Sequence, residues 1–305
     1  MDFIYLIKII ILSIVEGLTE FLPVSSTGHL IITSSLFELP QNNFMKLLMI
    51  VIQLAAILAV VVLYFSKLWQ LFIDLLKLKK PALHFWAKWI LASLPFVILA
   101  VPLHKYIERY LFNNLTVAIA LIIGGILLYF GEGYQVENPR AQKLDDLTYK
   151  QAFLIGAWQC LALFPGFSRS ASTIIGGWLA GLRTKLAAEF SFFLAIPLMF
   201  GASIFSFYKF FKVKNSFASL GDTMLAEQAV NLPFLQAEKQ HFLAGNSEYM
   251  QYVYLAIACL VSFLVALLVV KAFMRYLSKH SLKEMAIYRI VVGLVLCLLW
   301  LANLR

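Results

Sequence analysis

The strongest constraint on this chain is a series of apolar stretches, each close to the length that crosses a lipid bilayer. An α-helix rises about 1.5 Å per residue, so about 20 apolar residues span a hydrocarbon core of about 30 Å. The 305-residue chain is 62% hydrophobic and 13% charged, whereas roughly a quarter of the residues are charged in soluble domains. The sequence predicts an all-α polytopic membrane protein with six transmembrane helices, at about residues 45–65, 86–103, 116–131, 187–209, 251–271 and 286–301.

Two further apolar stretches, residues 2–37 and 150–181, are each interrupted near the middle by a polar turn. The turns read Pro23-Val-Ser-Ser-Thr-Gly-His29 and Pro165-Gly-Phe-Ser-Arg-Ser170. Proline breaks helices, and unpaired backbone is costly in lipid, so such a break persists only inside protein or beside a water-filled cavity. We therefore expect two re-entrant helical hairpins in addition to the six spans.

The two interrupted stretches also resemble each other. Residues 16–26 align with residues 158–168, which pairs Pro23 with Pro165 and Ser26 with Ser168. A related apolar run follows each, and an odd number of crossings per unit predicts an inverted-topology repeat whose two breaks meet near the membrane midplane. The prediction is a single integral membrane domain, 1–305, with repeat halves of about 1–131 and 150–305 and a polar periplasmic loop at 210–249.

The net charge of +9 comes from basic residues in short runs between the apolar stretches. This distribution is typical of cytoplasmic loops, and it argues against a basic face that binds nucleic acid. Three runs are assigned to the cytoplasm, which leaves both termini outside: Lys67, Lys77, Lys79, Lys80 and Lys88; Arg183 and Lys185; and Lys271, Arg275, Lys279 and Lys283. The first hairpin then enters from the periplasm and the second from the cytoplasm.

Glu16 and Glu20 lie just before the first break, four residues apart, so in a helix they project from one face. Two carboxylates held close together in a medium of low dielectric need a proton or a cation between them. Magnesium in proteins commonly takes one or two carboxylates together with the phosphate oxygens of a substrate. The pair therefore predicts a divalent metal site.

The first break supplies hydroxyls and an imidazole. Ser25, Ser26 and Thr27 suit the cap of a new helix, whose free N–H groups form an anion site. His29 lies three residues after Ser26 on the same helical face. A hydroxyl beside an imidazole is the arrangement of an activated nucleophile.

The second break supplies positive charge. Arg169 can grip two phosphate oxygens at once, and Gly166 lets the backbone approach closely. Hydroxyl donors surround the arginine at Ser168, Ser170, Ser172 and Thr173. No Gly-Lys-Ser/Thr follows either break, so nucleotide hydrolysis is not indicated. Carboxylates, hydroxyls and an arginine together predict phosphoryl transfer within the membrane.

The segments Glu16-Gly-Leu-Thr-Glu-Phe-Leu-Pro-Val-Ser-Ser-Thr-Gly-His29 and Pro165-Gly-Phe-Ser-Arg-Ser170 strongly resemble the two signatures of the bacitracin-resistance type of undecaprenyl-diphosphate phosphatase. Residues 51–60 and 190–197 extend the resemblance, which covers the chain apart from loop 210–249. It implies hydrolysis of undecaprenyl diphosphate to undecaprenyl phosphate and phosphate at the periplasmic face of the inner (plasma) membrane. That reaction recycles the lipid carrier of peptidoglycan synthesis and gives bacitracin resistance.

By this resemblance Glu16, Glu20, Ser26, His29 and Arg169 are the active residues, with a dependence on magnesium or calcium. The first attack remains open between Ser26, His29 and water, and the prediction is Ser26 with His29 as acid and base. The expected partners are a polyprenyl diphosphate and membrane lipid, and the sequence leaves the oligomeric state open. The residues expected to bind substrate are Ser25, Thr27, Gly166, Ser168, Ser170 and Thr173.

Two other functions share some of these features. A transporter or lipid flippase also uses inverted repeats with broken helices. A second class of membrane lipid phosphatases pairs Ser-Arg with a downstream histidine and aspartate, and residues 170–182 contain neither. The sequence therefore favours the phosphatase and leaves the flippase as the alternative.

Overall fold

The chain, as a computed structural model, is described for residues 2–40, 42–135, 141–219 and 248–303. These residues form helices and connecting turns, and no strand occurs among them. Up to residue 135 the helices are α1 (Phe3–Thr19), α2 (Ser26–Leu36), α3 (Asn43–Leu63), α4 (Phe65–Leu76), α5 (Lys80–Tyr106), the π-helix η1 (Ile107–Leu111), α6 (Asn114–Gly131) and η2 (Glu132–Tyr134). Then follow η3 (Leu144–Asp146), α7 (Tyr149–Gln159), η4 (Cys160–Leu163), α8 (Arg169–Leu179), α9 (Thr184–Ser219), α12 (Glu248–Tyr276) and α13 (Lys283–Asn303).

Six of these helices are long and apolar enough to cross a membrane, as predicted. They cover Phe44–Leu63, Lys80–Tyr106, Asn114–Tyr134, Thr184–Tyr208, Tyr249–Tyr276 and Lys283–Ala302. The chain is thus a multi-pass membrane protein. The boundaries differ from the predicted ones by one to six residues, most of all at the start of the second span, which begins at Lys80 rather than at residue 86. The first span ends at Leu63, two residues earlier than predicted, where the apolar run gives way to a turn at Tyr64 and the separate helix α4.

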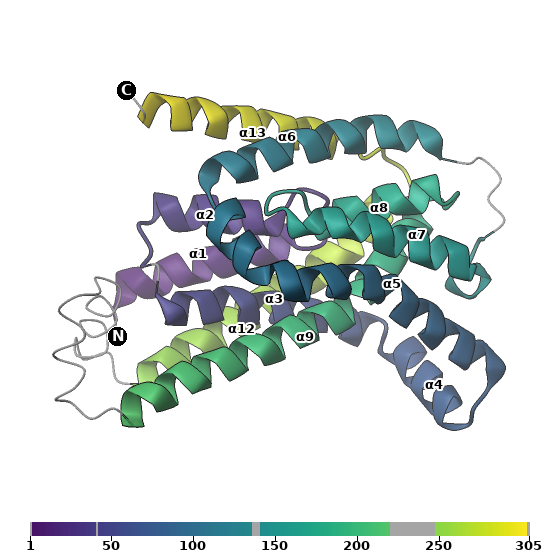
Figure 1. Cartoon of the computed structure of the whole chain (residues 1–305), viewed down its shortest axis with the longest axis horizontal. Coiled ribbons are helices and arrows are strands. Elements are labelled where there is room, and N and C mark those ends of the chain that lie inside the picture. The colour runs from purple at the N-terminus through teal and green to yellow at the C-terminus, as the bar shows by residue number, and fades with distance from the viewer. Residues whose placement is uncertain (1, 41, 136–140, 220–247, 304–305) are drawn as a thin grey trace.

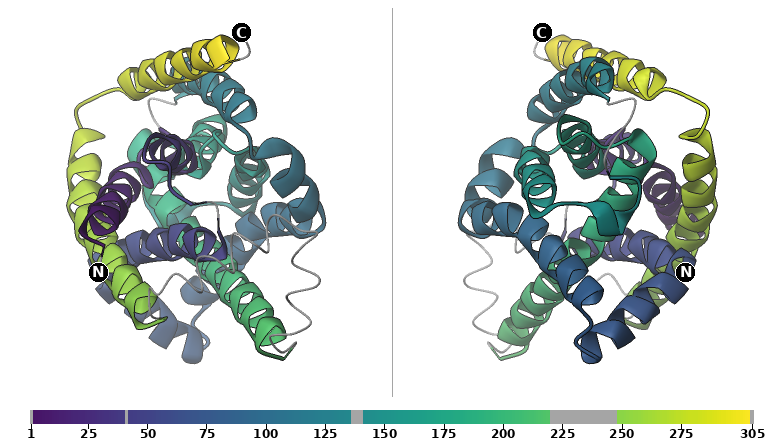
Figure 2. Two further views of the ribbon diagram at one scale, coloured as in Figure 1. Left: turned by 90° about the vertical axis from the view of Figure 1, so that its left-hand side faces the viewer. Right: turned by 90° about the vertical axis from the view of Figure 1, so that its right-hand side faces the viewer.

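The long helices run side by side along the longest axis of the molecule, and both chain ends lie at the same end (Figure 1). α6 packs on α13, α3 packs on α12 and α9, and α5 packs on α7. Viewed along the helices, α1, α7 and α8 lie toward the middle, with α5, α12 and α13 outside them (Figure 2). Small residues permit this close packing: a Cβ on Gly156 of α7 would lie 2.2 Å from the carbonyl oxygen of Ala92 in α5.

Both interrupted stretches are broken where the sequence predicts. α1 ends at Thr19 and α2 begins at Ser26, and the two helices pack together. α7 ends at Gln159, the turn η4 follows, and α8 begins at Arg169. The α1–α2 pair lies in the part of the molecule that holds both chain ends, and the α7–α8 pair lies toward the other end (Figure 1).

Two loop assignments need correction or comment. Lys88, which was assigned to a cytoplasmic loop, lies in α5 with 7% of its side chain exposed. Its ammonium donates to the carbonyl oxygens of Asp145 at 2.9 Å and Leu147 at 2.7 Å, so it fastens η3 to α5. The predicted polar loop 210–249 begins inside α9, which continues to Ser219, and residues 220–247 lie outside the described residues.

Candidate active site

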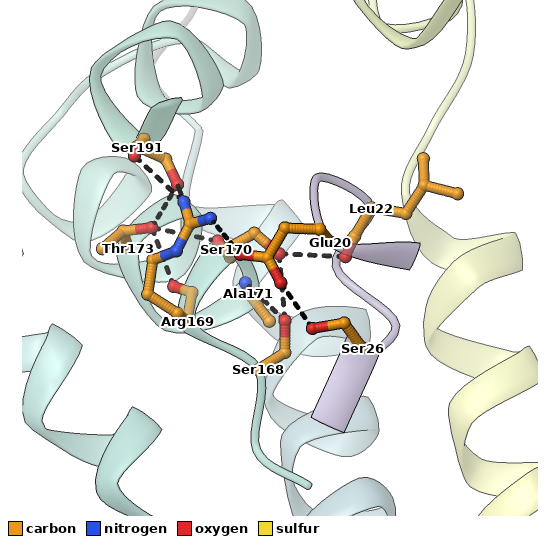
Figure 3. Close-up of polar contacts among 9 residues, drawn as sticks. All are labelled: Glu20, Leu22, Ser26, Ser168, Arg169, Ser170, Ala171, Thr173 and Ser191. Atoms are coloured by element: carbon orange, nitrogen blue, oxygen red, sulfur yellow. Dashed lines mark hydrogen bonds and ion pairs between the residues drawn. The ribbon is translucent and has the colours of Figure 1, made fainter. Parts of the chain in front are cut away.

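The two breaks touch each other through side chains that are far apart in the sequence. The guanidinium of Arg169 and the carboxylate of Glu20 form an ion pair of 2.8 Å, with 10% and 3% of the two side chains exposed. Next to it, the Ser170 hydroxyl donates to the carbonyl oxygen of Leu22 at 2.9 Å. Figure 3 shows these groups converging from the two broken segments. The expectation that the breaks meet is confirmed.

The first break ends in a serine that caps the next helix. Ser25 has a φ of 73°, which is uncommon for a residue with a side chain, and its hydroxyl accepts from the Gly28 N–H at 3.3 Å. Ser26 then begins α2, and its hydroxyl donates to the second carboxylate oxygen of Glu20 at 2.5 Å. Glu20 therefore holds Ser26 with one oxygen and Arg169 with the other.

The second break ends in the same way. Ser168 has a φ of 77°, and its hydroxyl accepts from the Ala171 N–H at 3.2 Å at the start of α8. The Ser168 and Ser170 hydroxyls lie 2.9 Å apart. The N-termini of α2 and α8 thus begin beside one ion pair, and helix N-termini favour bound anions.

Arg169 is held from two sides. One terminal nitrogen donates to the carbonyl oxygen of Ser191 at 3.0 Å and to its hydroxyl at 3.1 Å, while the other pairs with Glu20. The Thr173 hydroxyl lies 2.7 Å from the Ser191 hydroxyl and fixes it (Figure 3). The Nε of Arg169 is buried and has no partner among the described residues. The guanidinium has five N–H donors and its three described hydrogen bonds use three of them, so donors remain for a ligand.

Glu16 is the second carboxylate of the site. Its side chain is completely buried, and neither carboxylate oxygen has a hydrogen-bond partner among the described residues. It lies close enough to Glu20 and Arg169 for their charges to interact with its own. A buried carboxylate without a partner is costly, so this position calls for a proton or a cation. Groups of three or more His, Cys, Asp or Glu side chains that could form a metal site on their own do not occur among the described residues.

His29 differs from its prediction. Its Nδ1 lies 2.8 Å from the carbonyl oxygen of Ser25, and its Nε2 lies 2.7 Å from the Tyr288 hydroxyl. A carbonyl oxygen only accepts, so Nδ1 carries the proton and Nε2 accepts from the phenol. The expected Ser26–His29 hydrogen bond is replaced, because the Ser26 side chain points to the carboxylate of Glu20 and the imidazole folds back on the preceding turn.

Comparison with known proteins identifies the family. The model of the bacitracin resistance protein BacA family matches residues 9–295, nearly the whole chain. The chain belongs to this family. It is 42% identical to an undecaprenyl-diphosphatase of Clostridium tetani and 44% identical to one of Thermoanaerobacter sp., with 96% of each chain covered in both cases. An undecaprenyl-diphosphatase of Flavobacterium johnsoniae is 39% identical over 96% of this chain and 95% of its own. The resemblance inferred from the two motifs is confirmed.

In this BacA-family chain, several residues predicted to bind substrate are engaged by the protein itself. Ser25 and Ser168 cap helices, and Thr173 supports Ser191. Gly166, at a φ of 98°, does permit a close approach, but its neighbour is the backbone of Val117 in α6, only 2.5 Å from where a Cβ would lie. Thr27 is half-buried in the first turn of α2.

Three residues that contact the breaks lie outside both motifs and were missed. Ser191 in α9 holds Arg169, and Tyr288 in α13 holds His29. Arg289, the next residue, is completely buried and donates to carbonyl oxygens of both breaks. A signal for Arg289 was present, since an arginine inside an apolar span is rare and usually functional.

Proposed function

We propose that this chain is an undecaprenyl-diphosphatase that hydrolyses undecaprenyl diphosphate to undecaprenyl phosphate and inorganic phosphate. The reaction recycles the carrier lipid of peptidoglycan synthesis, and it gives bacitracin resistance. The relatives named for this activity support the proposal over the full length of the chain. The geometric observation that carries it is the position of Glu20, between a hydroxyl and a guanidinium at the start of two helices.

In the proposed mechanism Ser26 attacks the terminal phosphorus. The Ser26 hydroxyl already donates to Glu20, so this carboxylate takes the proton as the oxygen–phosphorus bond forms. The bond from phosphorus to the bridging oxygen breaks, and undecaprenyl phosphate leaves. Water then cleaves the phosphoserine and releases phosphate. The guanidinium of Arg169 and the N-termini of α2 and α8 stabilise the charge that spreads over the phosphoryl oxygens.

This mechanism changes the role first expected for His29. Because its Nδ1–H holds the carbonyl oxygen of Ser25, the imidazole supports the turn that presents Ser26. The residue that accepts the Ser26 proton is Glu20. Thr27, Ser168 and Ser170 remain candidates for contacts to the diphosphate at the two helix starts.

A divalent cation, magnesium or calcium, fits the chemistry of the carboxylates. The two oxygens of Glu16 have no hydrogen-bond partner in the part of the chain that the structure describes, whereas both oxygens of Glu20 already accept from other groups. Glu16 would therefore be the main protein ligand of such a cation, with Glu20 beside it and phosphate oxygens of the substrate as further ligands. When bound, the cation neutralises negative charge on the diphosphate.

The two broken helix pairs are proposed to be re-entrant hairpins of an inverted repeat, with halves 1–131 and 150–305. Ser25 and Ser168 support this interpretation, because both have a positive φ and both cap the following helix. The same offset along the chain relates Glu16 to Gln159, and both side chains are completely buried with no hydrogen-bond partner among the residues that the structure describes. This correspondence differs by one residue from the alignment of the two sequences, and it pairs Ser25 rather than Ser26 with Ser168.

The proposed location is the bacterial inner membrane, with the site open to the periplasm. The support is the charge bias of the connections: the α4–α5 connection, whose sequence includes Lys77, Lys79 and Lys80, lies at one end of the bundle and both chain ends lie at the other (Figure 1). The long polyprenyl chain of the substrate stays in the leaflet, so the diphosphate enters sideways between helices.

Phosphate release from undecaprenyl diphosphate by detergent-purified protein tests this function. We expect release that requires a divalent cation. The same protein in proteoliposomes, assayed for movement of the lipid between leaflets, separates hydrolysis from transport. Lipid movement without any phosphate release would contradict the proposal and make the chain a flippase.

A further inference from the structure

Arg289 joins the two breaks from a third element. One terminal nitrogen of its guanidinium donates to the carbonyl oxygen of Pro23 at 3.0 Å, in the first break. The other donates to the carbonyl oxygens of Gly166 at 3.3 Å and Phe167 at 2.6 Å, in the second break. The side chain is completely buried. A single planar group on α13 therefore sets the distance between the two turns.

These carbonyls need such a partner. Pro23, Gly166 and Phe167 are buried residues of the two turns, so their carbonyl groups have no intrahelical donors and little access to water. The forked guanidinium offers donors in two directions, which a lysine ammonium or a hydroxyl does not match. All the described hydrogen-bond acceptors of Arg289 are main-chain oxygens, so its contacts fix backbone rather than neutralise a side chain.

Gly124 provides the space for the Arg289 side chain. A Cβ on Gly124 of α6 would lie 2.1 Å from a terminal nitrogen of Arg289 and 3.1 Å from the carbonyl oxygen of Phe167. Glycine at position 124 is thus needed for the guanidinium to reach the second break. Two spans, α6 and α13, cooperate in holding one hydrogen-bonded group.

The turns that Arg289 joins carry the reacting groups. Pro23 lies between Glu20 and Ser26, and Phe167 lies two residues before Arg169. We propose that Arg289 is a positioning residue, which holds the Glu20–Ser26 pair and Arg169 in the relative position that phosphoryl transfer requires. This inference rests on the proposed hydrolysis. It concerns a residue outside both sequence motifs, acting through backbone carbonyls rather than on the substrate.

The test compares three variants in the phosphate-release assay, with kcat and KM measured separately. Arg289→Met keeps the volume but removes the donors, and Arg289→Lys keeps the charge but not the fork. Gly124→Ala leaves Arg289 intact and displaces its guanidinium. Since a misplacement of about 1 Å costs on the order of 100-fold in rate, we expect a loss of kcat of that size in Arg289→Met and Gly124→Ala, with KM little changed. Arg289→Lys should retain more activity than Arg289→Met.

Two matched controls separate positioning from general damage. Lys88→Met removes another buried cation, whose described hydrogen bonds go to the backbone carbonyls of Asp145 and Leu147 and not to either break. Gly201→Ala adds a Cβ inside α9, where nothing lies within 4 Å of it. Both controls should keep the parent kcat, even where Lys88→Met lowers thermal stability.

The outcomes distinguish the inference from the function on which it rests. A parent protein that releases no phosphate contradicts the proposed function itself. An active parent whose Arg289→Met and Gly124→Ala variants keep normal kcat overturns the positioning role. A rise in KM at constant kcat also overturns it, since it would mean that Arg289 only contributes to substrate binding. A loss of kcat equal to that in Lys88→Met would reduce Arg289 to a structural group.

Discussion

Glu20 and Arg169 are 149 positions apart in the chain, yet their side chains form a nearly buried ion pair of 2.8 Å. Each partner has a further contact, because Glu20 accepts from Ser26 and Arg169 donates to Ser191. The pair therefore links a nucleophile on one broken segment to a phosphate-binding group on the other. Removing one member leaves a buried charge without its partner, which makes both residues sensitive to substitution.

Glu20→Gln should abolish most of the phosphate release. Glutamine cannot take the proton of Ser26 and does not neutralise Arg169, and loss of a general base costs about 100- to 10,000-fold in kcat. The measurement is the initial rate of phosphate release by purified protein that has a normal size-exclusion profile. Glu189→Gln is the matched control, because Glu189 also pairs with a cation, Lys67 at 3.4 Å, but neither partner of this pair belongs to a break. Equal losses in both variants would contradict the base role.

Arg169→Lys should remain severely impaired although the charge is kept. A lysine ammonium cannot contact Glu20 and both oxygens of Ser191 as the guanidinium does. We expect a loss of about 100-fold in kcat/KM, comparable with the removal of an oxyanion donor. Arg183 is exposed, so Arg183→Lys serves as the control, and its kcat/KM should equal that of the parent protein. A lysine variant at position 169 with near-parent rates would make Arg169 a simple point charge.

Substitutions of Ser26 and His29 should lower the turnover rate to different extents. Ser26→Ala removes the proposed nucleophile and should eliminate turnover, whereas His29→Gln removes a support of the Ser25 turn and should leave measurable activity. Tyr288→Phe removes only the hydrogen bond to Nε2, so its effect should be smaller still. Rates of the three variants over a range of pH provide the test. An equal collapse of Ser26→Ala and His29→Gln would restore the serine–histidine pairing expected from the sequence.

The parts of the fold that were predicted depend on local signals. Hydropathy located all six spans, and a proline with a run of hydroxyl residues located both breaks. Glu20 and Arg169 stood out because ionisable side chains are rare in apolar segments. The two sequence motifs were sufficient to identify the family without any tertiary information.

The features that the sequence did not predict depend on contacts between distant segments. Ser26 was paired with His29 from helical spacing alone, but its hydroxyl turns toward Glu20, which α1 supplies from before the break. Arg289 is a rare charge in an apolar span, but nothing near it in the sequence indicates its partners, which lie more than 100 residues away. Lys88 was assigned to a loop by its charge, although α5 begins at Lys80 and buries it.

Chelation should stop phosphate release, and added magnesium or calcium should restore it. Glu16 is the group on which this depends, since its two oxygens have no partner among the described residues. Glu16→Gln should therefore lower the rate and raise the cation concentration needed for half-maximal activity. A titration of the parent and the variant with magnesium gives both values. Full activity of the parent in excess chelator would remove the metal from the mechanism.

The last prediction concerns the side of the membrane from which the site is reached. Single cysteines are placed in a background without Cys160, Cys259 and Cys297, and intact cells with a permeable outer envelope receive a membrane-impermeant thiol reagent. A cysteine at Ser168 is the sharper probe, because Ser168 is half-buried while Ser25 is only 2% exposed and should react slowly.

We expect position 168 to react from outside, although the α7–α8 pair to which it belongs lies toward the end of the bundle that holds the α4–α5 connection (Figure 1). A cysteine at Lys79, whose side chain is 53% exposed, should stay protected until the inner membrane is opened. This combination requires an aqueous path from the periplasm to the meeting point of the two breaks. Labelling of position 79 but not of position 168 would invert the orientation, and hydrolysis would then take place on the cytoplasmic side.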